Sequence, residues 1–180
     1  MMTPKPTIEA FDLWLYQKSI QLEAIVIGGA ALALLGVINR QTRDFDILQP
    51  NLSDEVLFEA KEFAKHLRNQ GVELGNEWLN NGPSQVAELL PKGWETRLQP
   101  LFNGHSLTLT TLGRPDLLKT KLFALCDRGT DLFDCLALAP SSSELIEATP
   151  WLEMQDTNPM WPEHVKSTLK NLEERLAHDL

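Results

Sequence analysis

The chain has 180 residues, of which 43% are hydrophobic and 23% are charged, and its formal net charge is -9. This length and composition are typical of one globular domain, or of one core with an appended subdomain. The negative charge argues against non-specific binding along a nucleic acid, which requires a basic surface, although Arg40, Arg43 and Lys61 could contribute to a local basic patch.

The first forty residues predict a helix, a buried strand and a second helix. Thr7 can cap the first helix. The apolar stripe of that helix has helical spacing and consists of Ile8, Phe11, Trp14 and Leu15. The β-branched run AIVI at 24–27 is typical of a buried strand. Gly28–Gly29 interrupts this pattern, and AALALLGVI at 30–38 has the composition of a buried helix.

The uncharged run of fifteen residues at 24–38 could indicate a membrane or signal segment. A membrane span requires about 18–20 apolar residues. A secretory signal would begin with a basic region near the N-terminus, whereas twenty-three residues precede this run. We therefore expect a buried core element, no membrane contact and a cytoplasmic location. Two cysteines, Cys126 and Cys135, predict no disulfide framework, and with the four histidines they show no zinc-ligand spacing.

A polar turn at 40–43 leads into the sequence RDFDIL at 43–48, whose alternation predicts a strand. Phe45 and Ile47 then face one side of the strand, and Asp44 and Asp46 face the other. After this strand, Ser53 is a good helix start, and the helix should run to about Asn69.

The second half predicts a hairpin followed by helices. Residues 71–93 show no clear pattern except a helical patch at Gln85–Leu90. The segments at 94–102 and 106–112 flank Asn103–Gly104 and predict a β-hairpin. Four helices follow, at 115–126, 131–138, 143–152 and 162–177. The expected fold class is α+β (α/β): a small mixed sheet flanked by helices over 1–112, and a C-terminal helical subdomain packed on it over 113–180.

The Gly-Gly bend and the Asp-x-Asp strand together predict a phosphate and metal site. Gly28 and Gly29 lack side chains, so a phosphate can approach the backbone N–H groups at the start of the helix. Asp44 and Asp46 share one face of the strand, and proteins hold Mg²⁺ with one or two carboxylates plus substrate phosphates. Two structural alternatives remain open: a tight turn without a ligand for the glycines, and the solvent side of an edge strand for the acids.

This arrangement resembles the DNA polymerase beta-type nucleotidyltransferase superfamily, whose signature is a Gly-Gly or Gly-Ser turn, a helix, and Asp-hydrophobic-Asp on a strand. The closer resemblance is to bacterial nucleotidyltransferase-like proteins of toxin–antitoxin and abortive-infection systems. Their Arg and Ser/Thr ahead of the acids appear here as Arg40-x-Thr42-x-Asp44-Phe45-Asp46. The segment at 114–138 is similar to their later motif. Its matching positions are Lys121, Arg128, Asp131 and Asp134.

Helix geometry singles out Lys121 independently of the resemblance. Leu117 and Leu125 are its i−4 and i+4 neighbours, so Lys121 lies within an apolar stripe. A lysine on a buried face extends its ammonium to water or meets an anion. We expect Lys121 to reach the acidic pair Asp44 and Asp46 or a triphosphate. Asp131 and Asp134 fit a capping pair at a helix start equally well.

The resemblance implies a Mg²⁺-dependent nucleotidyltransferase. Such an enzyme moves a nucleoside monophosphate from a nucleoside triphosphate such as ATP to the hydroxyl of a tRNA end, a protein or a small molecule, within a toxin–antitoxin system. The residues implied to bind the nucleotide are Gly28, Gly29, Arg40 and Thr42. Asp44 and Asp46 would bind the metal and act in catalysis. Lys121 would neutralise developing charge, and Asp131 would orient Lys121 or help activate the acceptor.

The chain departs from the superfamily pattern at one position. Active members usually carry a third carboxylate on a later strand, but the candidate strand at 106–111 contains no acid. This departure favours an alternative, a catalytically inactive nucleotidyltransferase-like protein. Such a protein would bind a nucleotide or a protein partner as the antitoxin or regulatory member of a pair.

Overall fold

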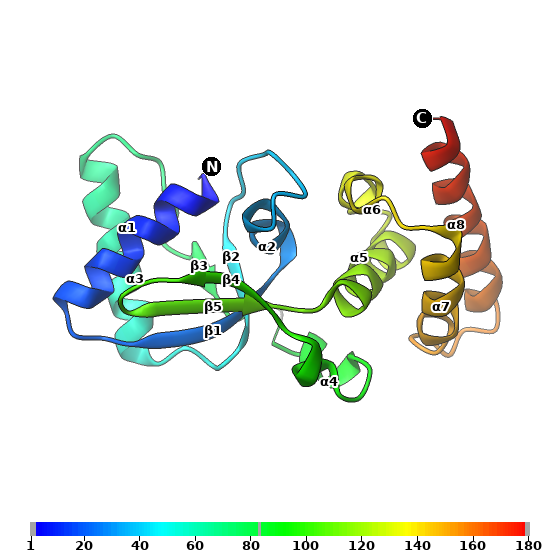
Figure 1. The fold of residues 1–180 in the computed structure, drawn as a ribbon, viewed down its shortest axis with the longest axis horizontal. Helices are drawn as coiled ribbons and strands as arrows, with labels where there is room; N and C mark the ends of the chain where they lie inside the picture. The colour runs from blue at the N-terminus through cyan, green and yellow to red at the C-terminus, as the bar shows by residue number, and fades with distance from the viewer. Residues whose placement is uncertain (1–2, 83, 179–180) are drawn as a thin grey trace. The chain divides into compact units, whose positions relative to one another are not determined.

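The computed structural model describes residues 3–82 and 84–178 of the chain (Figure 1). These residues divide into two units. The first unit comprises Met1–Leu90 and Glu95–Leu112, and the second comprises Pro91–Trp94 and Gly113–Leu180. The β-sheet belongs to the first unit, and the second unit is helical (Figure 1).

The first unit is built around a five-stranded mixed sheet in the order β3-β2-β1-β5-β4. The strands are β1 (Leu22–Ile27), β2 (Phe45–Gln49), β3 (Leu79–Asn80), β4 (Gln99–Asn103) and β5 (Leu107–Thr111). The helices are α1 (Pro4–Gln17), α2 (Gly28–Leu34), α3 (Asp54–Asn69) and α4 (Val86–Leu89). Strand β1 pairs antiparallel with β2 and parallel with β5. This architecture confirms the predicted α+β class.

Side chains from α1, α2 and α3 and from alternate strand residues form one core. Its strand members include Leu22, Ala24 and Val26 of β1, Phe45 and Ile47 of β2, and Leu107 and Leu109 of β5. At its centre the rings of Phe11 and Trp78 meet edge to face with centroids 4.9 Å apart. Because strand side chains alternate, the intervening residues, Asp46 among them, belong to the opposite face of the sheet, outside this core.

The caps predicted for the first and third helices have opposite outcomes. Ser53 caps α3 as predicted, since its hydroxyl accepts a hydrogen bond of 3.2 Å from the Val56 N–H. The prediction that Thr7 caps the first helix is wrong. Helix α1 begins at Pro4, because proline suits the first helical turn, and the Thr7 hydroxyl donates 2.8 Å back to the Thr3 carbonyl.

Two further elements differ from the sequence predictions. Residues Trp94–Arg97 form a 3-10 turn, η1, and the strand of the predicted hairpin begins only at Gln99. Helix α2 ends at Leu34 and does not continue to residue 38. Gly36 has a φ of +74°, and the Val37 N–H bonds to the Leu32 carbonyl at 2.9 Å, which is a helix-terminating arrangement.

The helices of the second unit lie close to their predicted bounds. They are α5 (Arg114–Arg128), α6 (Leu132–Leu138), α7 (Ser142–Glu153) and α8 (Trp161–His178). The first turns of α5 and α7 are joined by Arg114, whose Nε donates 2.6 Å to Glu144. The hydrogen bond from Arg114 and that from the Ser141 backbone lower the pKa of Glu144 to about 2. No helix in the described part of the chain is long and apolar enough to cross a membrane.

Asp12 of α1 fixes the loop between β4 and β5. Its carboxylate is 3% exposed and accepts backbone N–H bonds from His105, Ser106 and Leu107 at 2.8–3.0 Å. A Cβ at Gly104 would lie 2.4 Å from this carboxylate, so glycine is required there. Burial raises the pKa of Asp12, but these backbone donors and His105 outweigh burial, and its pKa is lowered overall.

Asp12→Asn should destabilise the first unit by about 2 kcal/mol at neutral pH, because an amide cannot accept all three N–H bonds. Since the folded pKa lies below the ordinary value of 3.8, the carboxylate's contribution is complete above that value. It is lost as the pH falls through the folded pKa. Thermal melts at pH 7 and pH 3 should therefore show a smaller gap between wild type and variant at pH 3. Exposed Glu9→Gln on the same helix is the control, and an equal gap at both pH values would contradict this role.

Candidate functional site

The Gly28–Gly29 bend lies directly against the predicted acidic and polar residues. The last residue of β1, Ile27, pairs with Asp46 of β2, so the bend begins beside this aspartate. Gly28 has a φ of +77°, and a Cβ there would lie 2.6 Å from Asp46 Oδ2. A Cβ on Gly29 would lie 3.4 Å from the Thr42 methyl and 3.8 Å from Arg40 Nη2. The structure thus brings together five of the six residues predicted for this site.

The sixth residue, Asp44, directly precedes the first residue of β2, and it is half-buried like Asp46. Between and beyond them, Phe45 and Ile47 are fully buried in the core. This is the alternation predicted from the sequence, with the two acids on the face opposite the core.

Asn80 of β3 is a member of the site that the sequence analysis missed. It pairs with Asp46 in the sheet, and its Nδ2 donates 3.5 Å to Asp46 Oδ1. The oxygen of the same side-chain amide, Asn80 Oδ1, accepts a hydrogen bond of 2.7 Å from the Gly82 N–H, which fixes the orientation of the amide. Strand β3 has only two residues, too few for an alternation pattern, so no local signal could have identified Asn80.

Thr42 carries a polar atom that the protein itself does not satisfy. The residue is 8% exposed, and its hydroxyl is buried with no hydrogen-bond partner among the described residues. A buried polar group without a partner costs about 1–3 kcal/mol. Such groups are rare in folded proteins and each requires an explanation. The methyl group on the same carbon faces Gly29, so this residue lies next to the Gly28–Gly29 bend.

The acidic residues of this site, Asp44 and Asp46, offer a small number of oxygen donors for a metal. Among the described residues no group of three or more His, Cys, Asp or Glu could hold a metal ion. Asp44 and Asp46 are hard carboxylate donors, and Mg²⁺ needs only one or two of these when substrate phosphates and water complete its shell. The donor set therefore fits a magnesium ion that arrives with a phosphorylated substrate.

Gly28→Ala should displace Asp46 and impair, by about tenfold or more, the binding of nucleotide with Mg²⁺ that the resemblance implies for this bend. The added methyl would meet Asp46 Oδ2 at 2.6 Å, at a backbone conformation that favours glycine. Calorimetry with ATP or CTP and Mg²⁺ measures the effect. Gly36→Ala is the matched control. Gly36 has a similar φ, +74°, but nothing lies within 4 Å of its added methyl. Equal binding losses in the two variants would show that strain, and not the contact with Asp46, is responsible.

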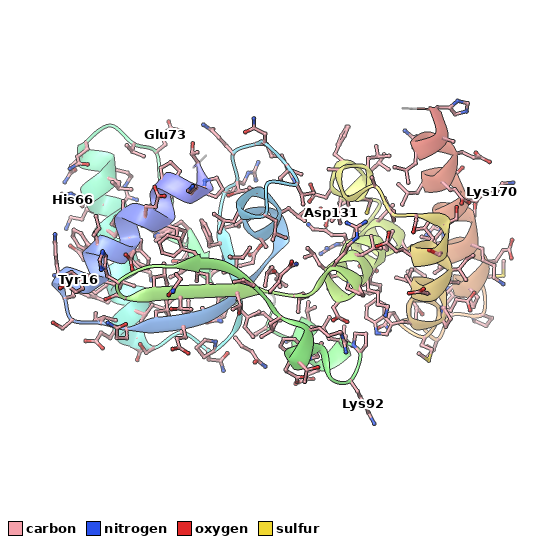
Figure 2. All side chains as sticks on the ribbon, in the orientation of Figure 1. Tyr16, His66, Glu73, Lys92, Asp131 and Lys170 are labelled. Atoms are coloured by element: carbon pink, nitrogen blue, oxygen red, sulfur yellow. The ribbon has the colours of Figure 1, made fainter. Side chains whose placement is uncertain are left out.

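The second unit holds the other predicted residues in a buried ion cluster. Lys121 of α5 is 6% exposed, and its ammonium lies 2.8 Å from Asp134 and 3.2 Å from Asp131. Asp131, labelled in Figure 2, occupies the position before α6, yet its side chain makes no capping hydrogen bond. Asp134 is 1% exposed. Lys121 therefore does not extend to water, and the two acids are its partners and not a capping pair.

Three other residues of this region are not members of the ion cluster. Arg128, which the later motif includes, is exposed, and its Nε lies 3.9 Å from Asp127. Cys126 and Cys135 are free and buried. Burial raises the pKa of Cys126 to about 11 and, together with the charge of Asp131, that of Cys135 to about 12. Both thiols are therefore protonated and unreactive at neutral pH.

Comparison with known families shows which family the chain belongs to. The model of a family described as a nucleotidyltransferase of unknown function, DUF6036, matches residues 7–151. The chain belongs to this nucleotidyltransferase family. The matched range includes the Gly28–Gly29 bend and the Lys121 cluster, so both lie within the family's shared region. No curated protein and no solved structure matches the chain.

Proposed function

We propose that the protein is a Mg²⁺-dependent nucleotidyltransferase whose triphosphate subsite is the Gly28–Gly29 bend. The observation that carries this proposal is the buried, unpartnered hydroxyl of Thr42, a residue whose methyl group faces Gly29 of the bend. A phosphate oxygen placed there would accept its hydrogen bond. Arg40, whose guanidinium lies at the same bend, would neutralise phosphate charge. Membership of a nucleotidyltransferase family supports the same conclusion.

The reaction would transfer a nucleoside monophosphate to an acceptor hydroxyl. The hydroxyl oxygen forms a bond to the α-phosphorus, and the bond from that phosphorus to the bridging oxygen breaks. Pyrophosphate leaves, and the hydroxyl proton passes to solvent. Asp44 and Asp46 would hold Mg²⁺, which when bound neutralises the phosphates and aligns them. Asn80, through its donor to Asp46, would restrict that carboxylate to one orientation.

The resemblance of Arg40-x-Thr42-x-Asp44-x-Asp46 to toxin–antitoxin nucleotidyltransferase-like proteins supports a place in such a system. The acceptor would then be a tRNA end, a protein or a small molecule. The charge-neutralising role proposed for Lys121, with Asp131 as its orienting partner, rests on this resemblance and on the ion pairs within the cluster.

A second candidate function is a nucleotidyltransferase-like protein that binds a nucleotide or a protein partner without catalysis. The described face of β5 opposite the core presents Thr108 and Thr110 and no carboxylate, and this favours the second candidate. Partner binding that survives Asp44→Ala, together with an absence of nucleotide binding, would support it. A nucleotide titration that depends on Asp44 and Mg²⁺ would favour the enzyme.

Thr42→Val should weaken nucleotide binding by about tenfold or more while leaving the protein as stable or more stable. Valine keeps the methyl that faces Gly29 and removes a hydroxyl whose burial is otherwise uncompensated. Calorimetry with ATP and CTP in Mg²⁺ measures binding, and thermal melts without nucleotide measure stability. Thr42→Ser, which retains the hydroxyl, is the matched control. Unchanged affinity in the valine variant would refute the proposed subsite.

A further inference from the structure

A groove of about 920 Å³ lies on the face of the sheet opposite the helical core. It is lined by residues of β1, β2 and β5 and by residues of the segment that contains α4. Glu23 and Ile25 of β1 and Thr108 and Thr110 of β5 line it and are not members of the core. All of its described lining residues belong to the first unit. A volume of this size accommodates a small organic ligand.

The described charged side chains that line the groove are all negative. Two carboxylates line it, those of Glu23 and Glu88, and no Lys, Arg or His occurs among its described lining residues. The other polar groups are the amides of Gln49, Asn51 and Gln85 and the hydroxyls of Ser84, Thr108 and Thr110. A phosphate would meet only negative charge and would be repelled. A protonated amine would meet two carboxylates, whose charge is opposite to its own. The hydroxyl groups of a ligand could form hydrogen bonds with the amide and hydroxyl groups of the lining.

Strand geometry connects this groove to the Asp46 site. Leu48 lines the groove and follows Asp46 by two residues on β2. Ile25 lines it from β1 and precedes by two residues Ile27, the partner of Asp46. Two residues of strand span about 7 Å. A ligand that fills the groove can therefore present a group to the acidic site without a change in the fold.

We propose that the groove binds the acceptor of the transfer reaction and that the acceptor is a compact amine bearing hydroxyl groups. This inference rests on the function proposed above. One hydroxyl of the acceptor would attack the α-phosphorus, with pyrophosphate leaving and the proton passing to solvent. The ammonium groups stay unmodified and pair with Glu23 and Glu88. The same charge argues against a tRNA end as the acceptor, because its phosphates would enter a groove of like charge.

The test uses two sugars of matched shape, the β-1,4-linked glucosamine trimer and cellotriose, which differ in the amines. Calorimetry on the full chain should show that the amino sugar binds at least about tenfold more tightly than cellotriose. Glu23→Gln/Glu88→Gln should remove this preference, and added salt should weaken it. Both glutamates are exposed, so the variant should fold. Glu9→Gln/Glu55→Gln, an exposed pair that does not line the groove and changes the net charge equally, should keep the preference.

Nucleotide affinity, measured in the same samples, separates this inference from the proposed function. The groove variant should bind ATP or CTP with Mg²⁺ as wild type does. Equal affinity for the two sugars, a preference that survives in the groove variant, or Asp46-dependent label transfer to tRNA would overturn the acceptor inference and leave the nucleotide site intact. Failure of wild type to bind any nucleotide would instead overturn the proposed function. The sugar preference would still report on the groove.

Discussion

Asp46→Asn should reduce nucleotidyl transfer by about two to three orders of magnitude, the size of effect seen when one preorganised charge-stabilising group is removed from an active site. Asparagine has nearly the shape of aspartate, so it fits against Gly28 and Asn80, where the aspartate carboxylate now lies. It removes the negative charge that would hold Mg²⁺. The rate is measured as label moved from an α-labelled nucleoside triphosphate to acceptor, together with released pyrophosphate.

Asp54→Asn is the matched control, because Asp54 is an exposed aspartate of the same unit in the first turn of α3. It should transfer label at the wild-type rate. If Asp46→Asn remained as active as this control, the carboxylate beside the Gly28–Gly29 bend would not be part of the active site. If wild type transferred no label but bound nucleotide, the binding protein described above would be the better account.

Lys121→Met should destabilise the second unit by about 3–5 kcal/mol, because it leaves two carboxylates without their cation. Asp134 is the more affected of the two, since it is 1% exposed and cannot recover hydration in place. Denaturant titration followed by circular dichroism measures the loss. Lys119→Met on the same helix, at a half-buried position that forms no ion pair among the described residues, should cost less than about 1 kcal/mol.

A combined variant separates stability from chemistry at this cluster. Lys121→Met/Asp131→Asn/Asp134→Leu replaces the ion cluster with less polar side chains, and such replacements are often neutral or stabilising. We expect it to regain most of the stability lost in Lys121→Met. If Lys121 also neutralises charge during transfer, the refolded variant should remain inactive. Wild-type transfer in this variant would show that the cluster only holds α5 against α6.

Local patterns were sufficient for most of the elements and for part of the site. The strand period of two placed Phe45 and Ile47 in the core and Asp46 on the other face, because a strand residue's side depends only on its position in the chain. The cap of α3 was also predictable from local sequence, because the Ser53 hydroxyl accepts a hydrogen bond from Val56, only three residues away. The Gly28–Gly29 bend was recognisable because two glycines between a β-branched run and an apolar helix interrupt both patterns.

Other features depended on partners distant in the sequence. Asn80 joined the site because β3 pairs with β2, and a two-residue strand carries no pattern. One difference was local: proline suits the first helical turn, so α1 begins at Pro4 and Thr7 is not its cap. Residues 94–97 form a 3-10 turn where the sequence pattern predicted a strand.

The sequence by itself determined the class of fold, the two acids on one strand face and the glycine bend before them, because these follow from chain periodicity and from the conformational freedom of glycine. Only the tertiary structure showed that Thr42 buries an unpartnered hydroxyl at this bend. It also showed that Lys121 pairs with Asp131 and Asp134. Burial and charge pairing are properties of groups brought together from different elements, and no single segment of the chain encodes them.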